Sequence, residues 1–157
     1  MDKLNIMRQD TVALDQQTDE LVILDQTRLP GETVFLRLSD PQEIHDAIYK
    51  LQVRGAPAIG VAAAIGIYAV CKRLPDSDYA SFAAEFSRVK SYLVSARPTA
   101  VNLAWALERM ERVVLENSGR TTAELKELLR DKALELRDED IRVCRAIGEN
   151  GLTLIRD

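Results

Sequence analysis

The sequence predicts an α+β domain in which a small N-terminal antiparallel sheet precedes a bundle of about five helices. Two short apolar runs, 20–25 and 33–38, are separated by the turn residues Pro30 and Gly31, and a further strand is expected near 12–14. In the rest of the chain the apolar residues recur at helical spacing instead. With 157 residues, 46% of them apolar, the chain has the size of one domain that can bury a core.

The helical part is divided by clear start and stop signals. Asp40 with Glu43, and Thr121 with Glu124, each have the spacing of a capping box at a helix start. The segment that follows Pro57 is apolar on every face, so it should be the central helix. The helices are expected at about 40–53, 58–73, 77–95, 100–116 and 121–149.

The end of the sequence leaves two interpretations open. Asn150 and Gly151 are expected to end the last helix, and the apolar residues 152–155 then resemble a strand. That strand could begin a second domain or could add to the N-terminal sheet. We divide the chain into a sheet portion at 1–39, a helical portion at 40–150 and the start of a further domain at 151–157.

Composition excludes several classes of function. A net charge of −4 does not suit a nucleic-acid partner, which needs concentrated Lys and Arg. The apolar run 55–71 is too short to span a membrane, so we expect a cytoplasmic protein without a membrane partner. Cys71 and Cys144 are interpreted as reduced, buried thiols. Neither a metal-binding nor a cofactor-binding motif is present in the sequence, so neither metal nor cofactor is expected.

The most informative segment is Arg54-Gly55-Ala56, directly before the apolar helix. Amides at a helix start attract anions, Gly55 allows close approach of a ligand, and Arg54 can add two hydrogen bonds to a phosphate. The alternative is that Arg54 pairs with an internal carboxylate and Gly55 only ends the preceding helix. Free amides are expected at Ala56, Ala58 and Ile59.

A second arginine precedes a second helix. Arg97 is followed by Pro98 and Thr99, and two such junctions could bring two guanidinium groups to one anion. The alternative is a surface arginine in a turn between helices. Asp25 is interpreted either as a polar contact at a strand end or as an Asx turn, and His45 as a solvated surface residue.

Three motifs together resemble methylthioribose-1-phosphate isomerase. They are Leu24-Asp25-Gln26-Thr27-Arg28-Leu29-Pro30, Val53-Arg54-Gly55-Ala56-Pro57-Ala58-Ile59-Gly60 and Ala96-Arg97-Pro98-Thr99-Ala100-Val101-Asn102-Leu103. Residues 147–151 also resemble the approach to that family's next motif. The resemblance covers nearly the whole chain.

The resemblance implies a function in methionine salvage. That family converts 5-methylthioribose 1-phosphate to 5-methylthioribulose 1-phosphate without metal or cofactor, and its phosphate contacts match Arg54, Gly55, Ala56 and Arg97 here. Its catalytic cysteine and aspartate lie beyond the point that corresponds to Asp157, so no catalytic residue is expected in this chain. The implied partners are a sugar phosphate, a missing Rossmann-like C-terminal domain and, for the full-length protein, a second copy in a homodimer.

Two other functions remain open on the same motifs. One is isomerisation of a related pentose phosphate, either ribose 1,5-bisphosphate or 5-deoxyribose 1-phosphate, because the pocket for the C5 substituent cannot be identified in these residues. The other is a non-catalytic regulatory module like the initiation factor 2B subunits, which are relatives in the same superfamily.

Overall fold

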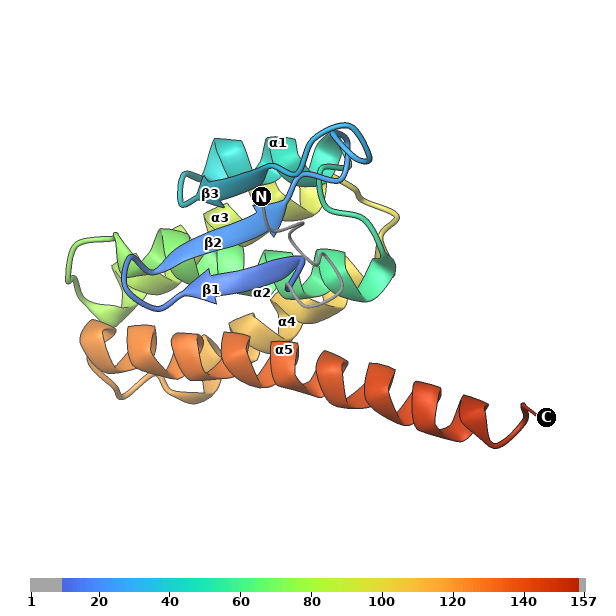
Figure 1. Ribbon diagram of the computed structural model, residues 1–157. Helices are drawn as coiled ribbons and strands as arrows, with labels where there is room; N and C mark the ends of the chain where they lie inside the picture. The colour runs from blue at the N-terminus through green and yellow to red at the C-terminus, as the bar shows by residue number, and fades with distance from the viewer. Residues whose placement is uncertain (1–9, 156–157) are drawn as a thin grey trace.

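The computed structural model describes residues 10–155 and confirms the predicted α+β fold (Figure 1). Strands β1 (Val12–Asp15), β2 (Glu20–Leu24) and β3 (Phe35–Leu38) form an antiparallel sheet in the order β1-β2-β3. The helices that follow are α1 (Pro41–Tyr49), α2 (Ala56–Lys72), α3 (Tyr79–Ser95), α4 (Val101–Glu116) and α5 (Thr122–Leu152). Among the described residues no helix is long and apolar enough to cross a membrane.

The sheet presents one apolar face to the helices. Leu21 in the middle strand pairs with Leu14 on one side and with Leu38 on the other, and all three side chains are buried. Since side chains alternate along a strand, this row fixes which face turns inward. Strands β1 and β2 pack with that face against α2.

Helix α2 forms the centre of the fold. Every residue from Ile59 to Cys71 is buried, and the helix contacts the sheet and the other four helices. Two glycines allow this close packing. A Cβ atom on Gly60 would lie 2.8 Å from the backbone oxygen of Asn102 in α4, and one on Gly66 would lie 2.9 Å from Cγ2 of Ile44 in α1.

The helix directions bring two connections to the same end of the molecule. Helices α2 and α4 start at the right-hand end of the view in Figure 1, and α3 and α5 run back toward it. The close approach of Gly60 to Asn102 joins the N-terminal parts of α2 and α4. The α1–α2 and α3–α4 connections, which contain the two candidate arginines, therefore share one end of the bundle.

The predicted helix starts are largely confirmed. Thr121 and Glu124 form the full capping box at the start of α5. Asp40 caps α1 by accepting hydrogen bonds from the amides of Gln42 and Glu43. In the described part of the chain, however, the Glu43 side chain makes no return bond to Asp40, so this capping box is only half formed.

The predicted strand at 152–155 is wrong. Helix α5 continues through Asn150 and Gly151 to Leu152, and 153–154 form a turn. The Asn150 side chain donates to the backbone oxygen of Ala146, which satisfies it within the helix. The end of α5 projects away from the sheet (Figure 1), so a strand there would have no pairing partner among residues 10–155. A continued helix satisfies its own backbone groups.

Two helical glycines provide a test of this packing. Gly60→Ala places a methyl group against the backbone oxygen of Asn102, which cannot move without shifting α4, so we expect destabilisation of about 1–3 kcal/mol. Gly148→Ala is the control, because nothing lies within 4 Å of its Cβ position and Ala stabilises a helix by about 0.5–1 kcal/mol relative to Gly. Urea unfolding measures both. Equal effects of the two substitutions would contradict the close approach of α2 and α4.

Candidate functional site

The first turn of α2 leaves backbone amides open. Gly55 is the N-cap residue, its φ of 95° lies in the left-handed region, and no side chain caps the helix. Within residues 10–155 no acceptor is described for the amides of Ala56 and Ala58. The amide of Ile59 was also expected to be free, but it donates to the backbone oxygen of Gly55 at 2.9 Å. Two open amides and the helix dipole therefore face outward together.

The first turn of α4 has the same character. Its N-cap residue, Ala100, provides no side-chain hydrogen bond, and Val101 is 78% exposed. In contrast, α1, α3 and α5 are capped by the side chains of Asp40, Asp78 and Thr121. Of the five helices in the described part of the chain, the two that follow a candidate arginine are the two without a side-chain cap. Their free ends lie at the same end of the bundle.

The two arginines lie beside these helix starts, and no carboxylate within residues 10–155 is described as paired with either of them. Arg54 is exposed, and its Nε donates to the backbone oxygen of Leu51 at 3.1 Å, which leaves the two terminal nitrogens available. Arg97 is half-buried. The alternative interpretation, in which Arg54 pairs with an internal carboxylate, is not supported, because no such ion pair occurs among residues 10–155. No contact between the two guanidinium groups is described there either.

A hollow of about 150 Å³ adjoins both first turns. Pro57 of α2, Trp105 of α4 and Val143 of α5 contribute apolar walls, while Glu139 and Asp140 of α5 contribute carboxylates. Glu139 is paired with Nη1 of Arg109 at 2.7 Å, whereas no cation partner is described for Asp140 within residues 10–155, so the charge of Asp140 makes the hollow itself a poor place for an anion. An anion at the helix starts would sit beside this hollow and not inside it.

Asp25 follows the end of β2 and is hydrogen-bonded to the segment between α1 and α2. Its Oδ1 accepts from the amide and the hydroxyl of Thr27 at 3.0 and 2.6 Å, and its Oδ2 accepts from Nε2 of Gln52 at 2.8 Å. Both sequence interpretations of Asp25 are therefore confirmed, since the residue forms an Asx turn and also makes a polar contact at a strand end. Burial acts to raise the pKa of Asp25, but these hydrogen bonds outweigh it, so the pKa is lowered from 3.8.

Two sequence interpretations of reactive side chains are corrected. His45 is not solvated, since its side chain is only 18% exposed and its ring stacks on Tyr92 with centroids 4.5 Å apart. The helical pattern could not indicate this, because the covering ring comes from α3. Cys144 is exposed on α5, whereas Cys71 is buried as expected. Burial raises the pKa of the Cys71 thiol to about 12, so this thiol is a poor nucleophile.

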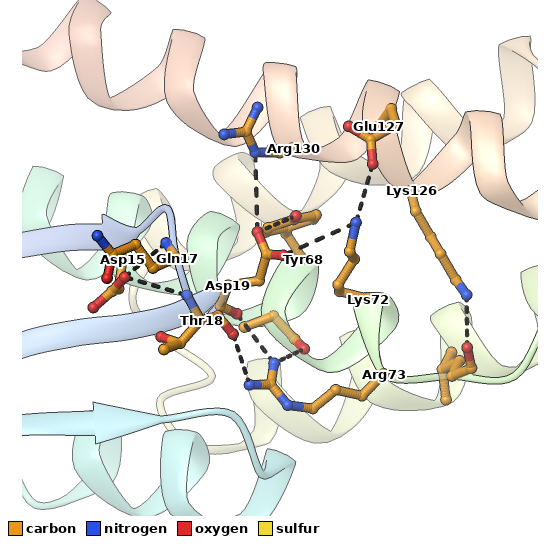
Figure 2. A network of polar contacts seen from close by, with 12 residues as sticks. Asp15, Gln17, Thr18, Asp19, Tyr68, Lys72, Arg73, Lys126, Glu127 and Arg130 are labelled. Carbon is orange, nitrogen blue, oxygen red and sulfur yellow. Dashed lines mark hydrogen bonds and ion pairs between the residues drawn. The ribbon is translucent and has the colours of Figure 1, made fainter.

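At the opposite end of α2, the charged side chains pair with one another. Figure 2 shows Asp19, in the β1–β2 turn, accepting a 2.6 Å hydrogen bond from the hydroxyl of Tyr68 and facing Lys72 and Arg130, each at 3.9 Å. Arg73 donates to the backbone oxygens of Thr18 and Asp19. Here the charges satisfy one another and tie the hairpin to α2 and α5, which is a structural arrangement. Within residues 10–155 no cluster of three or more metal-binding side chains occurs.

The comparisons with known proteins assign the family. The sequence profile described as the Initiation factor 2 subunit family matches residues 52–157, about two thirds of the chain. The chain is 52% identical over 142 residues to a methylthioribose-1-phosphate isomerase from Parabacteroides distasonis, and 50% identical over 138 residues to a 5-deoxyribose 1-phosphate isomerase from Moorella thermoacetica. The chain belongs to the Initiation factor 2 subunit family.

The alignments cover most of this chain but less than half of each relative. They span 90% and 88% of this chain, and 42% and 39% of the two relatives. Among solved structures, the 5-methylthioribose 1-phosphate isomerase of Pyrococcus horikoshii matches with a TM-score of 0.78 and 34% identity, over 82% of this chain and 36% of its own. The translation initiation factor eIF-2B subunit delta of A. fulgidus matches with a TM-score of 0.84 and 35% identity, over 94% and 42%.

The lowered pKa of Asp25 gives a testable pH dependence. As the pH falls, the unfolded chain takes up this proton before the folded protein does, so the stabilisation from Asp25 is complete above about pH 3.8 and is lost as the pH falls through the lower folded pKa. Asp25→Asn removes this titration. We expect the variant to be less stable by about 1 kcal/mol at neutral pH, because charged hydrogen bonds are replaced by neutral ones.

The measurement is the free energy of unfolding in urea at a series of pH values below neutrality. The slope on the acid side should be shallower in Asp25→Asn than in the unsubstituted chain. Gln52→Met, which removes one of the hydrogen bonds that lower the pKa, should give an intermediate slope. An unchanged slope in Asp25→Asn would contradict the lowered pKa.

Proposed function

We propose that this chain is the N-terminal domain of an aldose–ketose isomerase that converts 5-methylthioribose 1-phosphate to 5-methylthioribulose 1-phosphate, and that it binds the phosphate of the substrate. The names of the relatives support the reaction. The observation that carries the binding role is the uncapped start of α2, where the amides of Ala56 and Ala58 lie open next to Arg54.

The chemistry of this turn suits a phosphate monoester. Open amides at a helix start donate to phosphate oxygens, and the helix dipole favours the negative charge. The φ of Gly55 is one that L side chains rarely adopt, and its missing side chain lets phosphate oxygens approach the backbone. Arg54 can supply a two-pronged contact, and Arg97 a second positive charge from the neighbouring connection.

In this proposal the chain supplies no acid–base group. Isomerisation needs an acid that opens the sugar ring and a group that moves hydrogen between C1 and C2. Cys71 is buried in the last turn of α2, about 22 Å along the helix from its first turn at 1.5 Å per residue. His45 is held against Tyr92. We therefore assign the catalytic cysteine and aspartate to a C-terminal domain that follows this one.

The exposed half of α5 supports that division. All residues from 141 to 150 are exposed, and they include the apolar Ile141, Val143 and Ile147. A folded domain seldom leaves such a helix uncovered, so we propose that a Rossmann-like domain that follows α5 packs here. The full-length enzyme is proposed to be a cytoplasmic homodimer.

Two other functions have specific support. The relative from Moorella thermoacetica, at 50% identity, favours a 5-deoxyribose 1-phosphate substrate, which differs only at C5. The match to the initiation factor subunit of A. fulgidus favours a non-catalytic module. Comparing kcat/KM of the full-length protein on the 5-methylthio and 5-deoxy sugar 1-phosphates distinguishes the substrates. Absence of turnover on both would favour the non-catalytic module.

Replacing the two arginines tests the phosphate role. In the full-length protein, Arg54→Ala and Arg97→Ala should each raise KM for the sugar 1-phosphate by about 10- to 100-fold with a smaller change in kcat, because the phosphate contact is made in both ground and transition states. Arg112→Ala is the control, since Arg112 is exposed in the second half of α4. Steady-state kinetics at fixed ionic strength give both constants. Unchanged constants in both variants would rule out the phosphate role.

The isolated 157-residue chain should bind sugar phosphate weakly and should not convert it, because the proposed acid–base groups lie outside it. Proton NMR of the sugar C1 and C2 positions would follow the reaction directly. Turnover above the rate of a protein-free sample would refute the assignment of catalysis to a further domain.

A further inference from the structure

One buried carboxylate in the structure accepts its described hydrogen bonds from neutral groups alone. Asp25 is 3% exposed, and its three described hydrogen bonds come from the amide and hydroxyl of Thr27 and from the side-chain amide of Gln52. A buried carboxylate is unfavourable unless hydrogen bonds compensate for the lost water. An apolar residue would avoid this desolvation cost, so the carboxylate is explained by what its three hydrogen bonds hold in place.

They hold the connection between α1 and α2. Besides the Asp25–Gln52 contact, the amide of Gln26 donates to the backbone oxygen of Gln52 at 2.9 Å, and the side chain of Gln26 lies 3.5 Å from the oxygen of Arg54. Asp25 therefore holds the side chain of Gln52, and Gln26 holds the backbone of Gln52, which lies two residues before Arg54. No other hydrogen bond described for residues 10–155 links the β2–β3 connection to 50–55.

This connection has an unusual backbone, which is held in part by the end of α1, where the amides of Leu51 and Gln52 donate to the backbone oxygens of Ile48 and Ala47. Leu51 has a φ of 58° and Gly55 a φ of 95°, so the chain enters the left-handed region twice within five residues. A leucine in that region is disfavoured and persists only where the surroundings impose it. Gln52 lies next to Leu51, and Arg54 donates to the oxygen of Leu51, so the direction of Arg54 depends on this backbone.

We infer that Asp25, acting through Gln52, is a positioning residue that holds the 51–55 turn so that Arg54 and the open amides of Ala56 and Ala58 face one phosphate group. The inference rests on the proposed function for its ligand. Asp25 does not touch the phosphate in this arrangement. It determines the backbone from which the phosphate contacts are made.

An exchange of the two side-chain groups tests the pair directly. Gln52→Glu sets a second carboxylate against Asp25 at hydrogen-bond distance, which should break the contact and release the turn. The double variant Asp25→Asn/Gln52→Glu restores one amide facing one carboxylate with the positions exchanged. The double variant should therefore recover what Gln52→Glu loses, as expected for two directly coupled residues.

Two measurements on the chain report separately on the stability of the 51–55 turn and on the binding of phosphate. Amide hydrogen exchange of Gln26, whose proton is held by Gln52, follows the turn without any ligand. A titration with inorganic phosphate at constant ionic strength, observed at the amides of Ala56 and Ala58, follows binding. Gln52→Glu should speed the exchange and weaken phosphate binding by about tenfold each, and the double variant should return both to within about twofold of the unsubstituted chain.

Two control variants separate positioning from general effects. Gln42→Glu adds the same charge to the exposed first turn of α1 and should leave both measurements unchanged. Tyr68→Phe removes the buried hydroxyl that bonds to Asp19 and should lower stability without affecting phosphate binding, because it lies toward the other end of α2. If weaker phosphate binding in Gln52→Glu came from lost stability alone, Tyr68→Phe would show it as well.

The possible outcomes separate the positioning role of Asp25 from the phosphate-binding role of the chain. If the unsubstituted chain binds phosphate and Gln52→Glu binds it equally well, or if the double variant recovers nothing, the positioning role of Asp25 is overturned while the phosphate site stands. If the amides of the unsubstituted chain do not respond to phosphate, the proposed phosphate-binding role of this chain fails, and the assignment of Asp25 to a ligand site fails with it.

Discussion

The whole structure depends on one helix that is buried on every face. Helix α2 can sit between the sheet and the other helices only because its backbone groups bond within the helix and because Gly60 and Gly66 let α4 and α1 come close. A buried helix still has two ends, where backbone groups remain without helical partners. One of these ends has a structural role, and the other belongs to the candidate functional site.

The two ends of α2 are treated in opposite ways. At the last turn, Lys72 and Arg73 join the β1–β2 hairpin and α5 in a network of hydrogen bonds and ion pairs around Asp19 (Figure 2). At the first turn, no side chain caps the helix, and Arg54 lies without a carboxylate partner among the described residues. An exposed helix start with open amides next to a cation offers hydrogen-bond donors and positive charge to an anion.

The candidate site was partly predictable because its main signals are local. A glycine and a proline at a helix start, with an arginine before them, can be recognised from three or four adjacent residues, and the same holds for the connection that contains Arg97. The support of that turn was not predictable. Asp25 and Gln52 are 27 residues apart, and nothing in either segment indicates that their side chains meet. His45 was misjudged for the same reason, because α3 covers it.

By itself, the sequence determined the elements whose cause is local: the alternating strands, the caps at Asp40 and Thr121, and an apolar helix that had to be central. Only the tertiary structure decided what depends on neighbours distant in sequence. Residues 152–155 have the composition of a strand, yet among the described residues no strand edge lies where they could pair, so α5 continues to Leu152 and a turn follows. Likewise, packing of α2 against α4 brought two separate arginine-containing connections to one end of the bundle. A short polar motif specifies its own turn, but which groups share a site depends on how buried surfaces fit together.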